Sequence, residues 1–237
     1  MVKQNEPDHS QIYAEEAERY DLLVAREMRE EVFRAMDEIA DWRGKVVVEL
    51  GAGTGSLSVR IGASARSLTL LDASPHMLEL AGRRLAEAGI RHARYAEADH
   101  LALPLDSASA DIVLAGWTLC YAASSDKPEW QARLRRAMGE IRRVLRPGGT
   151  AVIIETLGTG NETPQPPSFL QPYYRELERT YGFRHRWVRA GFKFASAEEA
   201  ERLVRFFFGS ELADRVKAER LTAVPGCAGI WWRQMTP

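Results

Sequence analysis

Val46-Val47-Val48-Glu49-Leu50-Gly51-Ala52-Gly53-Thr54-Gly55 begins as a short apolar run, reaches an acid, and continues as three glycines alternating with small residues. An apolar run of this length bounded by glycines is typical of a buried parallel strand. The glycines allow a tight turn and bring bare backbone close to a ligand. Leu57, Val59 and Ile61 then fit the start of a helix. The pattern predicts a nucleotide-binding crevice at the carboxyl end of a strand in an open α/β sheet.

The glycine turn differs from the dinucleotide-binding fingerprint G-x-G-x-x-G. Its third glycine, Gly55, comes one residue early, and Ser56 stands where the fingerprint has glycine. Glu49 lies two residues before the first glycine. A carboxylate at the mouth of the turn would repel a diphosphate but suit a cationic ligand. S-adenosylmethionine is such a ligand, because it carries an ammonium, a sulfonium and no phosphate.

The segment from Glu49 to Gly55 resembles the first motif of the class I S-adenosylmethionine-dependent methyltransferases, of the small-molecule, methyltransferase type 11-like kind. In that family the glycine turn lies along the methionine part of the cofactor, and its backbone helps to hold the amino-acid group. The resemblance therefore implies cofactor contacts from Glu49, Gly51, Ala52, Gly53, Thr54 and Gly55.

A second apolar strand, Leu68 to Leu71, ends in Asp72. Asp72 follows the glycine turn by about twenty residues, where nucleotide folds place the carboxylate that accepts the ribose hydroxyls. Two acceptor oxygens match two hydroxyl donors. The resemblance assigns Asp72 to the ribose and adds contacts from Ala73 and Met77, although Asp72 would also serve as a simple cap of the helix that Ser74 and Pro75 begin.

Two later segments extend the resemblance. In the family an acid near the end of the third strand bonds the adenine amino group, which implies Asp99, with His100 and Leu101 beside the ring. The next strand, Ala110 to Trp117, would end beneath the transferred methyl group. There Trp117 would either face the sulfonium through a cation–π contact or pack under the cofactor.

The resemblance ends with a helix, the Pro147-Gly148-Gly149 turn and a strand to Glu155. It implies a Rossmann-like, doubly wound α/β sheet of seven strands, mostly parallel with an antiparallel last strand. Phe183–Arg189 and Gly226–Trp232 would form the final strand pair, with two helices between them. One methyltransferase domain would fill residues 1–237, divided into an N-terminal helical lid (1–43), a cofactor-binding core (44–156) and a substrate-side part (157–237).

Aromatic residues mark the expected lid and substrate side. Tyr13 to Asp21 resembles the helix that closes over the cofactor, so Tyr13 is expected to contact it, whereas Tyr20 fits the core equally well. The glycine- and proline-rich loop 157–167 is expected to rim the substrate side. The aromatic group that follows it would line a substrate pocket or fill the core: Tyr173, Tyr174, Tyr181, His185 and Trp187.

Methyl transfer from a sulfonium is an in-line displacement with an activated donor, so the protein must mainly align the reactants and exclude water. The product would be S-adenosylhomocysteine. A general base is needed only if the acceptor loses a proton, and the candidates are His185 and Tyr121, with His100 less favoured because it is expected beside adenine. The acceptor atom stays open among oxygen, nitrogen, carbon and sulfur.

Composition and motifs argue against a nucleic-acid acceptor, a metal site and a membrane segment. A net charge of −1 offers no phosphate-binding surface, and residues 116–119 lack the Asn/Asp-Pro-Pro-Tyr/Phe motif of enzymes that methylate base amines, so a nucleic-acid acceptor is disfavoured. Cys120 and Cys227 do not suggest a metal site. The polar N-terminus and the lack of a long apolar run predict a cytoplasmic protein without a membrane segment.

Two other functions would use the same crevice. A nicotinamide-dependent oxidoreductase is one, although Ser56 and Glu49 count against it. A non-catalytic S-adenosylmethionine-binding protein is the other, because the glycine turn, Asp72 and Asp99 all serve binding alone. Titration with S-adenosylmethionine and with NAD separates the first alternative from methyl transfer.

Overall fold

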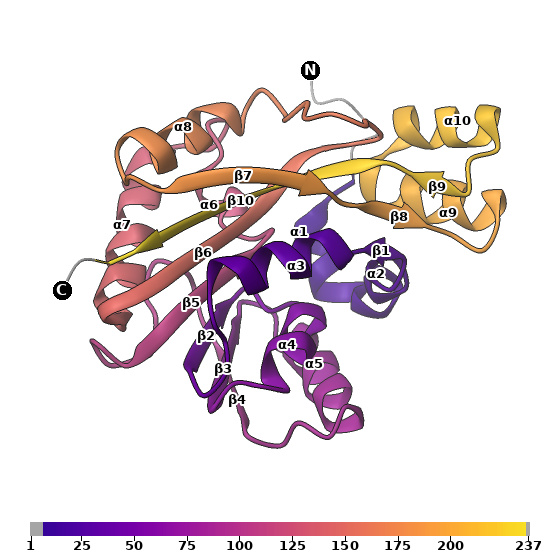
Figure 1. The fold of residues 1–237 in the computed structure, drawn as a ribbon. Coiled ribbons are helices and arrows are strands. Elements are labelled where there is room, and N and C mark those ends of the chain that lie inside the picture. The colour runs from indigo at the N-terminus through magenta and orange to yellow at the C-terminus, as the bar shows by residue number, and fades with distance from the viewer. Residues whose placement is uncertain (1–6, 236–237) are drawn as a thin grey trace.

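The computed structural model describes residues 7–235, which fold around one large sheet (Figure 1). Its order is β4-β3-β2-β5-β6-β10-β7. The bounds of its strands are β2 (Val46–Leu50), β3 (Ser67–Asp72), β4 (Ala93–Glu97), β5 (Ala110–Gly116), β6 (Leu145–Thr159), β7 (Arg184–Arg189) and β10 (Gly226–Gln234). Neighbours from β4 to β6 are parallel, and β10 runs antiparallel between β6 and β7. The predicted seven-stranded sheet with an antiparallel last strand is confirmed.

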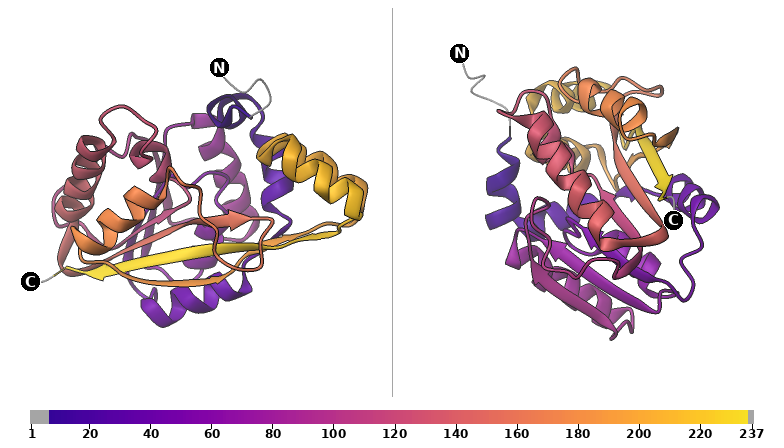
Figure 2. Two further views of the ribbon diagram at one scale, coloured as in Figure 1. Left: turned by 90° about the horizontal axis from the view of Figure 1, so that it is seen from above. Right: turned by 90° about the vertical axis from the view of Figure 1, so that its left-hand side faces the viewer.

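Helices cover both faces of this sheet (Figures 1 and 2). The core on one face includes residues of α3 (Glu30–Ile39), α4 (Ser56–Gly62) and α5 (Pro75–Glu87), and the core on the other includes residues of α7 (Trp130–Val144) and α8 (Gln171–Arg179). In α7, Leu134, Met138 and Ile141 recur every three or four residues and are buried, as an amphipathic helix requires. A short helix, α6 (Cys120–Ala123), follows β5.

A third, smaller core lies at one end of the molecule, to the right in Figure 1. It joins α9 (Ala197–Phe208) and α10 (Ser210–Glu219) to a small sheet of order β1-β8-β9, made of β1 (Glu27–Met28), β8 (Gly191–Lys193) and β9 (Ala223–Val224). Ser196 caps α9 by accepting from the Glu199 amide. The small sheet links the N-terminal part of the chain to its C-terminal part.

Two helices precede β1: α1 (His9–Glu15) and α2 (Ala17–Val24). They divide at Glu16, so the segment expected to form the lid is two short helices. Among residues 7–235, no helix is long and apolar enough to cross a membrane. Within the same range, no cluster of three or more His, Cys, Asp or Glu side chains has the arrangement of a metal site.

Candidate functional site

The glycine turn joins β2 to α4 at the carboxyl edge of the sheet. Gly51, Gly53 and Gly55 have φ values of +61°, +53° and +78°, which L side chains rarely adopt. A Cβ added at Gly53 would meet no atom within 4 Å, whereas one at Gly55 would lie 3.0 Å from Ala81 on α5. The turn is therefore open at Gly53 and packed against the protein at Gly55.

Ala52 and Thr54 support the turn from beneath. Both are buried. The Ala52 amide donates to the Leu71 carbonyl, and the Thr54 hydroxyl accepts from Arg84 at 2.9 Å. Arg84 also pairs with Asp21 on α2. The side chains of Ala52 and Thr54 are thus enclosed by the protein, and the Thr54 carbonyl also accepts from Arg84.

Asp72 ends β3 directly beside the turn. Its Oδ2 accepts from the Gly53 amide at 2.8 Å and its Oδ1 accepts from the Ser74 amide at 2.9 Å. Burial raises the pKa of Asp72, and these amide bonds oppose the rise. The structure therefore brings the predicted ribose acid and the open glycine together. Of its predicted neighbours, Ala73 is exposed, whereas Met77 is buried in α5 with its amide bonded to the Ser74 hydroxyl.

The sequence suggested that Glu49 lies at the mouth of the turn, but in the structure it does not. It is 2 % exposed, and its carboxylate accepts from the Ser58 hydroxyl on α4 at 2.5 Å. Side chains alternate across a strand, so Glu49 shares the α4 face of β2 with Val47. Burial raises the pKa of Glu49 to about 7. Its charge therefore depends on pH near neutrality.

The wall towards β4 contains the residues predicted to contact adenine. Asp99 is exposed, and its Oδ1 accepts from the Leu101 amide at 2.8 Å. His100 reaches in the other direction, with its Nε2 2.8 Å from the Thr118 hydroxyl beyond β5. Burial lowers the pKa of His100 despite nearby Asp72 and Asp99. His100 thus spans the carboxyl edge of the sheet, while Asp99 stays at its rim.

Trp117 begins the segment that follows β5. Its backbone has a φ of +51°, and its ring packs against the core on the side of α3 and α4. The next residue, Thr118, lies over Gly51, so the segment bears directly on the glycine turn.

Helix α1, expected from the sequence to be part of a lid, contacts the segment after β3 and helix α6. The Tyr13 carbonyl accepts from the Ser74 hydroxyl at 3.0 Å, and the Tyr13 hydroxyl lies 2.6 Å from the Tyr121 hydroxyl on α6. Burial raises the pKa of both phenols well above the ordinary value, so both are protonated at neutral pH. Tyr121 is therefore suited to donate a hydrogen bond rather than to act as a base. The rings around this contact form an aromatic cluster: His9, Tyr13, Tyr20, Tyr121 and Phe207.

His185, the other candidate base, lies away from the crevice. It is on β7, three strands from β5, which is about 14 Å at the usual strand spacing. Its ring stacks on Trp231 with the centroids 4.3 Å apart. Together with Tyr174 and Trp187 it lines a separate groove of about 410 Å³. The expectation that His185 stands near the methyl group is therefore wrong, because β10 enters the sheet between β6 and β7.

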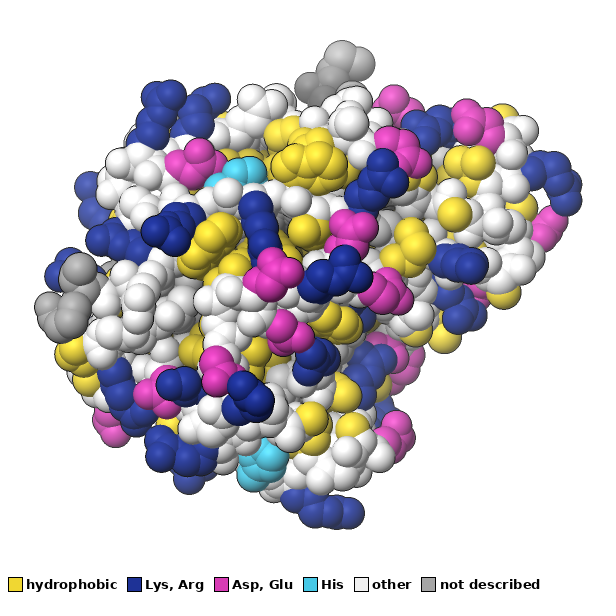
Figure 3. All heavy atoms as spheres, in the orientation of Figure 1, with side chains coloured by type: hydrophobic (Ala, Val, Ile, Leu, Met, Phe, Trp, Pro, Cys, Tyr) yellow, Lys and Arg dark blue, Asp and Glu magenta, His cyan; other side chains and the backbone are white. Residues whose placement is uncertain are grey.

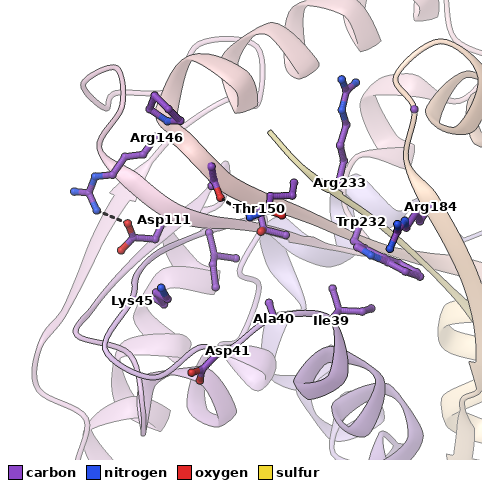
Figure 4. Close-up of a pocket in the computed structure, with 16 residues that line it drawn as sticks. Ile39, Ala40, Asp41, Lys45, Asp111, Arg146, Thr150, Arg184, Trp232 and Arg233 are labelled. Atoms are coloured by element: carbon purple, nitrogen blue, oxygen red, sulfur yellow. Dashed lines mark hydrogen bonds and ion pairs between the residues drawn. The ribbon is translucent and has the colours of Figure 1, made fainter. Parts of the chain in front are cut away.

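A second cavity, of about 790 Å³, lies at the opposite edge of the sheet (Figure 4). Its lining includes Lys45 at the start of β2, Asp111 in β5 and Trp232 in β10. Asp111 pairs with Arg146 at 2.6 Å and accepts from the Val46 amide. These bonds tie the amino ends of the parallel strands together, far from the glycine turn.

Two sites with largely buried ionisable side chains were not expected from the sequence. Glu155, at 0 % exposure near the carboxyl end of β6, accepts from the Cys120 amide at 3.0 Å and from the Tyr173 hydroxyl at 3.3 Å. Its burial raises its pKa to about 7. The sequence does contain a signal for Glu155, because it is an acid at the end of an apolar run, like Glu49 and Asp72. The second group is the Glu27–Arg29 ion pair, in a charged segment that carries no comparable signal.

Comparisons with known proteins agree with this architecture. Residues 48–153 match the family model described as a methyltransferase domain. The demethylmenaquinone methyltransferase of Lactococcus lactis is 31% identical over 164 residues, which are 66% of this chain and 61% of that protein. The enzyme of the same name from Thermus thermophilus is 34% identical over 151 residues, 61% of this chain and 64% of that protein. The chain thus spans about three fifths of the length of these curated relatives.

A solved S-adenosylmethionine-dependent methyltransferase from Aquifex aeolicus has the same fold. Its TM-score is 0.55 at 14% identity, with 95% of this chain and 93% of that chain covered. The matched residues include the end of β2, the glycine turn, Asp72 and β5. On these comparisons, residues 48–153 are similar to methyltransferase domains, and the chain has the fold of solved S-adenosylmethionine-dependent methyltransferases.

Proposed function

We propose that this protein transfers the methyl group of S-adenosylmethionine to a small-molecule acceptor and releases S-adenosylhomocysteine. The observation that carries the proposal is the junction of Asp72 with Gly53, where a carboxylate at the end of β3 lies 2.8 Å from the amide of an open glycine. A ribose diol has donors for that carboxylate, and the open space at Gly53 leaves room for the rest of the nucleoside. Asp72 and the turn would therefore hold the cofactor.

The charges around the turn support this cofactor over a dinucleotide. Asp21, Glu27, Glu49 and Asp72 lie around the turn with Arg29 and Arg84, so that acids outnumber cations there. S-adenosylmethionine has two positive groups and one negative group, which suits such surroundings, whereas a diphosphate would be repelled. The contribution of Glu49 varies with pH, because its pKa is about 7.

The bound cofactor supplies an electrophilic methyl carbon and a sulfur that leaves as a neutral thioether. The protein aligns the acceptor and keeps water out, which is the larger part of catalysis for such a displacement. The α1 lid would close the crevice through the contact of Tyr13 with Tyr121. The Tyr121 hydroxyl, 2.6 Å from that of Tyr13, is placed to donate a hydrogen bond to an acceptor.

An aromatic small molecule is the acceptor class that we favour. The aromatic cluster under the lid offers faces and edges for stacking with a planar ring. The two curated relatives are named for a quinone substrate, demethylmenaquinone. A nucleic acid is disfavoured, because basic and acidic side chains are interspersed on the face in Figure 3 rather than gathered into a basic patch.

Calorimetric titration of the purified protein tests the cofactor. S-adenosylmethionine and S-adenosylhomocysteine should bind, and NAD should not. Incubation with methyl-labelled S-adenosylmethionine and a panel of phenols, reduced quinones and amines then tests transfer, with label expected in an aromatic acceptor. Binding of NAD without S-adenosylhomocysteine would overturn the proposal. Tight S-adenosylhomocysteine binding without transfer to any panel member would favour the non-catalytic alternative.

A further inference from the structure

His9, the first residue of α1, lies in the aromatic cluster and is held there by α9. Its Nε2 is 2.9 Å from the Phe207 carbonyl oxygen, and its ring stacks on the Phe207 ring with the centroids 4.4 Å apart. A carbonyl oxygen only accepts hydrogen bonds, so Nε2 carries the proton in this contact. In the neutral imidazole the other ring nitrogen, Nδ1, then has the free electron pair and can accept a proton. The fold therefore fixes both the position and the tautomer of His9.

The aromatic cluster joins His9 to two sides of the crevice. The centroid of the His9 ring lies 6.0 Å from that of Tyr121 and 6.3 Å from that of Tyr13. Tyr121 belongs to α6, just after β5, and the Tyr13 carbonyl accepts from Ser74, two residues after Asp72. The His9 side chain is half-buried. His9 therefore lies where the aromatic acceptor is proposed to bind, and its ring stays within reach of solvent.

The other four histidines of the chain make different contacts. His76 bonds a carboxylate on α2, and His100 bonds the hydroxyl of the segment that follows β5. His185 lies on β7, outside β10, and His92 directly precedes β4 at the amino edge of the sheet. His9 is therefore the histidine that lies with the two phenols of the cluster.

We propose that His9 is the general base of the methyl transfer, with its Nδ1 taking the proton of a phenolic hydroxyl on the acceptor. The inference rests on the proposed function. The O–H bond of the acceptor breaks and its proton passes to Nδ1, while an electron pair of the oxygen forms the bond to the methyl carbon. The bond from methyl to sulfur breaks with its electron pair on sulfur, which leaves as a neutral thioether. The imidazolium then returns the proton to solvent.

The surroundings of His9 suit the positive charge that it gains. Phe207 is the next-to-last residue of α9, so its carbonyl has no partner within the helix and lies at the end with partial negative charge. A charged imidazolium donates a stronger hydrogen bond to that carbonyl than a neutral ring does. The neighbouring phenols, Tyr13 and Tyr121, carry no positive charge to oppose it. The Tyr121 hydroxyl would donate to the acceptor oxygen as its proton leaves.

The test separates removal of a proton from positioning of the acceptor. His9→Gln can keep an N–H donor for the Phe207 carbonyl but has no basic nitrogen, and His9→Ala has neither. With a phenol that is protonated at the assay pH, both variants should lower kcat by about a hundredfold or more and keep the affinity for S-adenosylhomocysteine, measured by calorimetry, within about twofold. With a nitrophenol that is already ionised at that pH, kcat of His9→Gln should stay within about threefold of the wild type, because no proton remains to be removed. Added imidazole should restore part of the kcat of His9→Ala.

His76→Gln is the matched control, because it removes a histidine that bonds Glu18 outside the aromatic cluster, and it should leave kcat unchanged for both acceptors. An unchanged kcat of His9→Gln with the protonated phenol would overturn the inference. An equal loss with both acceptors would also overturn it, since His9 would then only position the acceptor. If His9→Ala does not fold, His9→Gln alone decides.

The wild-type protein distinguishes failure of this inference from failure of the proposed function. Transfer to another member of the panel but to neither phenol would overturn the role of His9 as a base for a phenol and leave the function intact. Transfer to no member of the panel would contradict the function itself.

Discussion

Thr118 lies over Gly51 so closely that a Cβ at Gly51 would stand 2.0 Å from the Thr118 Oγ1. The same hydroxyl is 2.8 Å from the His100 Nε2, so the contact joins the glycine turn to both of its walls. Gly53, two residues on, has nothing within 4 Å of its missing side chain. The first glycine of the turn is thus required by the packing of the protein, and the second faces the space proposed for the cofactor.

Substitutions at these two glycines should therefore have different effects, one mainly on stability and the other mainly on cofactor binding. Gly51→Ala forces both a positive φ and a clash with Thr118, and should lower the free energy of unfolding by about 2–4 kcal/mol. Gly53→Ala carries only the φ strain, about 1 kcal/mol. Gly53→Val should abolish S-adenosylhomocysteine binding, since its side chain enters cofactor space. Urea unfolding and calorimetry measure both effects, and similar unfolding free energies for the two alanine variants would contradict the packing argument.

Asp72→Ala should weaken cofactor binding far more than it weakens the fold. The carboxylate holds the Gly53 and Ser74 amides as well as the proposed ribose, so Asp72→Asn, which keeps one acceptor oxygen, is the matched control. We expect S-adenosylhomocysteine binding to fall about tenfold or more in Asp72→Ala, with a smaller loss in Asp72→Asn. If the affinity for S-adenosylhomocysteine fell by less than about threefold in the alanine variant, the assignment of Asp72 to the ribose would be wrong.

Glu49 should couple cofactor binding to pH. Burial raises its pKa to about 7 in the free protein, so the carboxyl is neutral in about half of the molecules at that pH. A cationic ligand nearby favours the ionised form. Affinity for S-adenosylmethionine should therefore rise between about pH 6 and 8 and then level off. Calorimetry across this range should show the rise in the wild type and a flat profile in Glu49→Gln, whereas affinity that fell with pH would place the ligand's positive groups elsewhere.

The residues that could be predicted are those set by local pattern. Gly51, Gly53 and Asp72 follow from a strand, a turn and a second strand close together in the chain. The error over Glu49 was also local, since alternation along β2 already placed it on the face of Val47. The pairing of β7 with β10 was expected as the final strand pair, and it places His185 at the outer edge of the sheet. The position of Arg29 depends on the pairing of β1 with β8, two short distant segments, and no pattern near Arg29 encodes it.

Glu155 should make the fold less stable as the pH rises. Its pKa is about 7 in the folded protein against an ordinary value of about 4.5, so folding favours the neutral carboxyl. The unfolded chain loses this proton first, and stability should fall from about pH 4.5 to 7, by up to about 3 kcal/mol, and then stay level. Urea unfolding at several pH values should show a shallower fall in Glu155→Gln. Parallel profiles for the two proteins would mean that Glu155 is ionised in the folded state.

The hydroxyl contact of Tyr13 with Tyr121 should hold the lid closed. It joins α1 to α6 at 2.6 Å, and both phenols are protonated at neutral pH, as any phenol with a pKa of about 10 or higher is. In Tyr121→Phe the ring packing survives but the bond is lost, which should cost about 1 kcal/mol of local stability. Amide hydrogen exchange in residues 9–15 should then speed up by about fivefold. Tyr95→Phe, on the exposed surface of β4, is the control and should change nothing there. Exchange that stayed at the wild-type rate in Tyr121→Phe would show that α1 is held by its aromatic packing and the Ser74 contact alone.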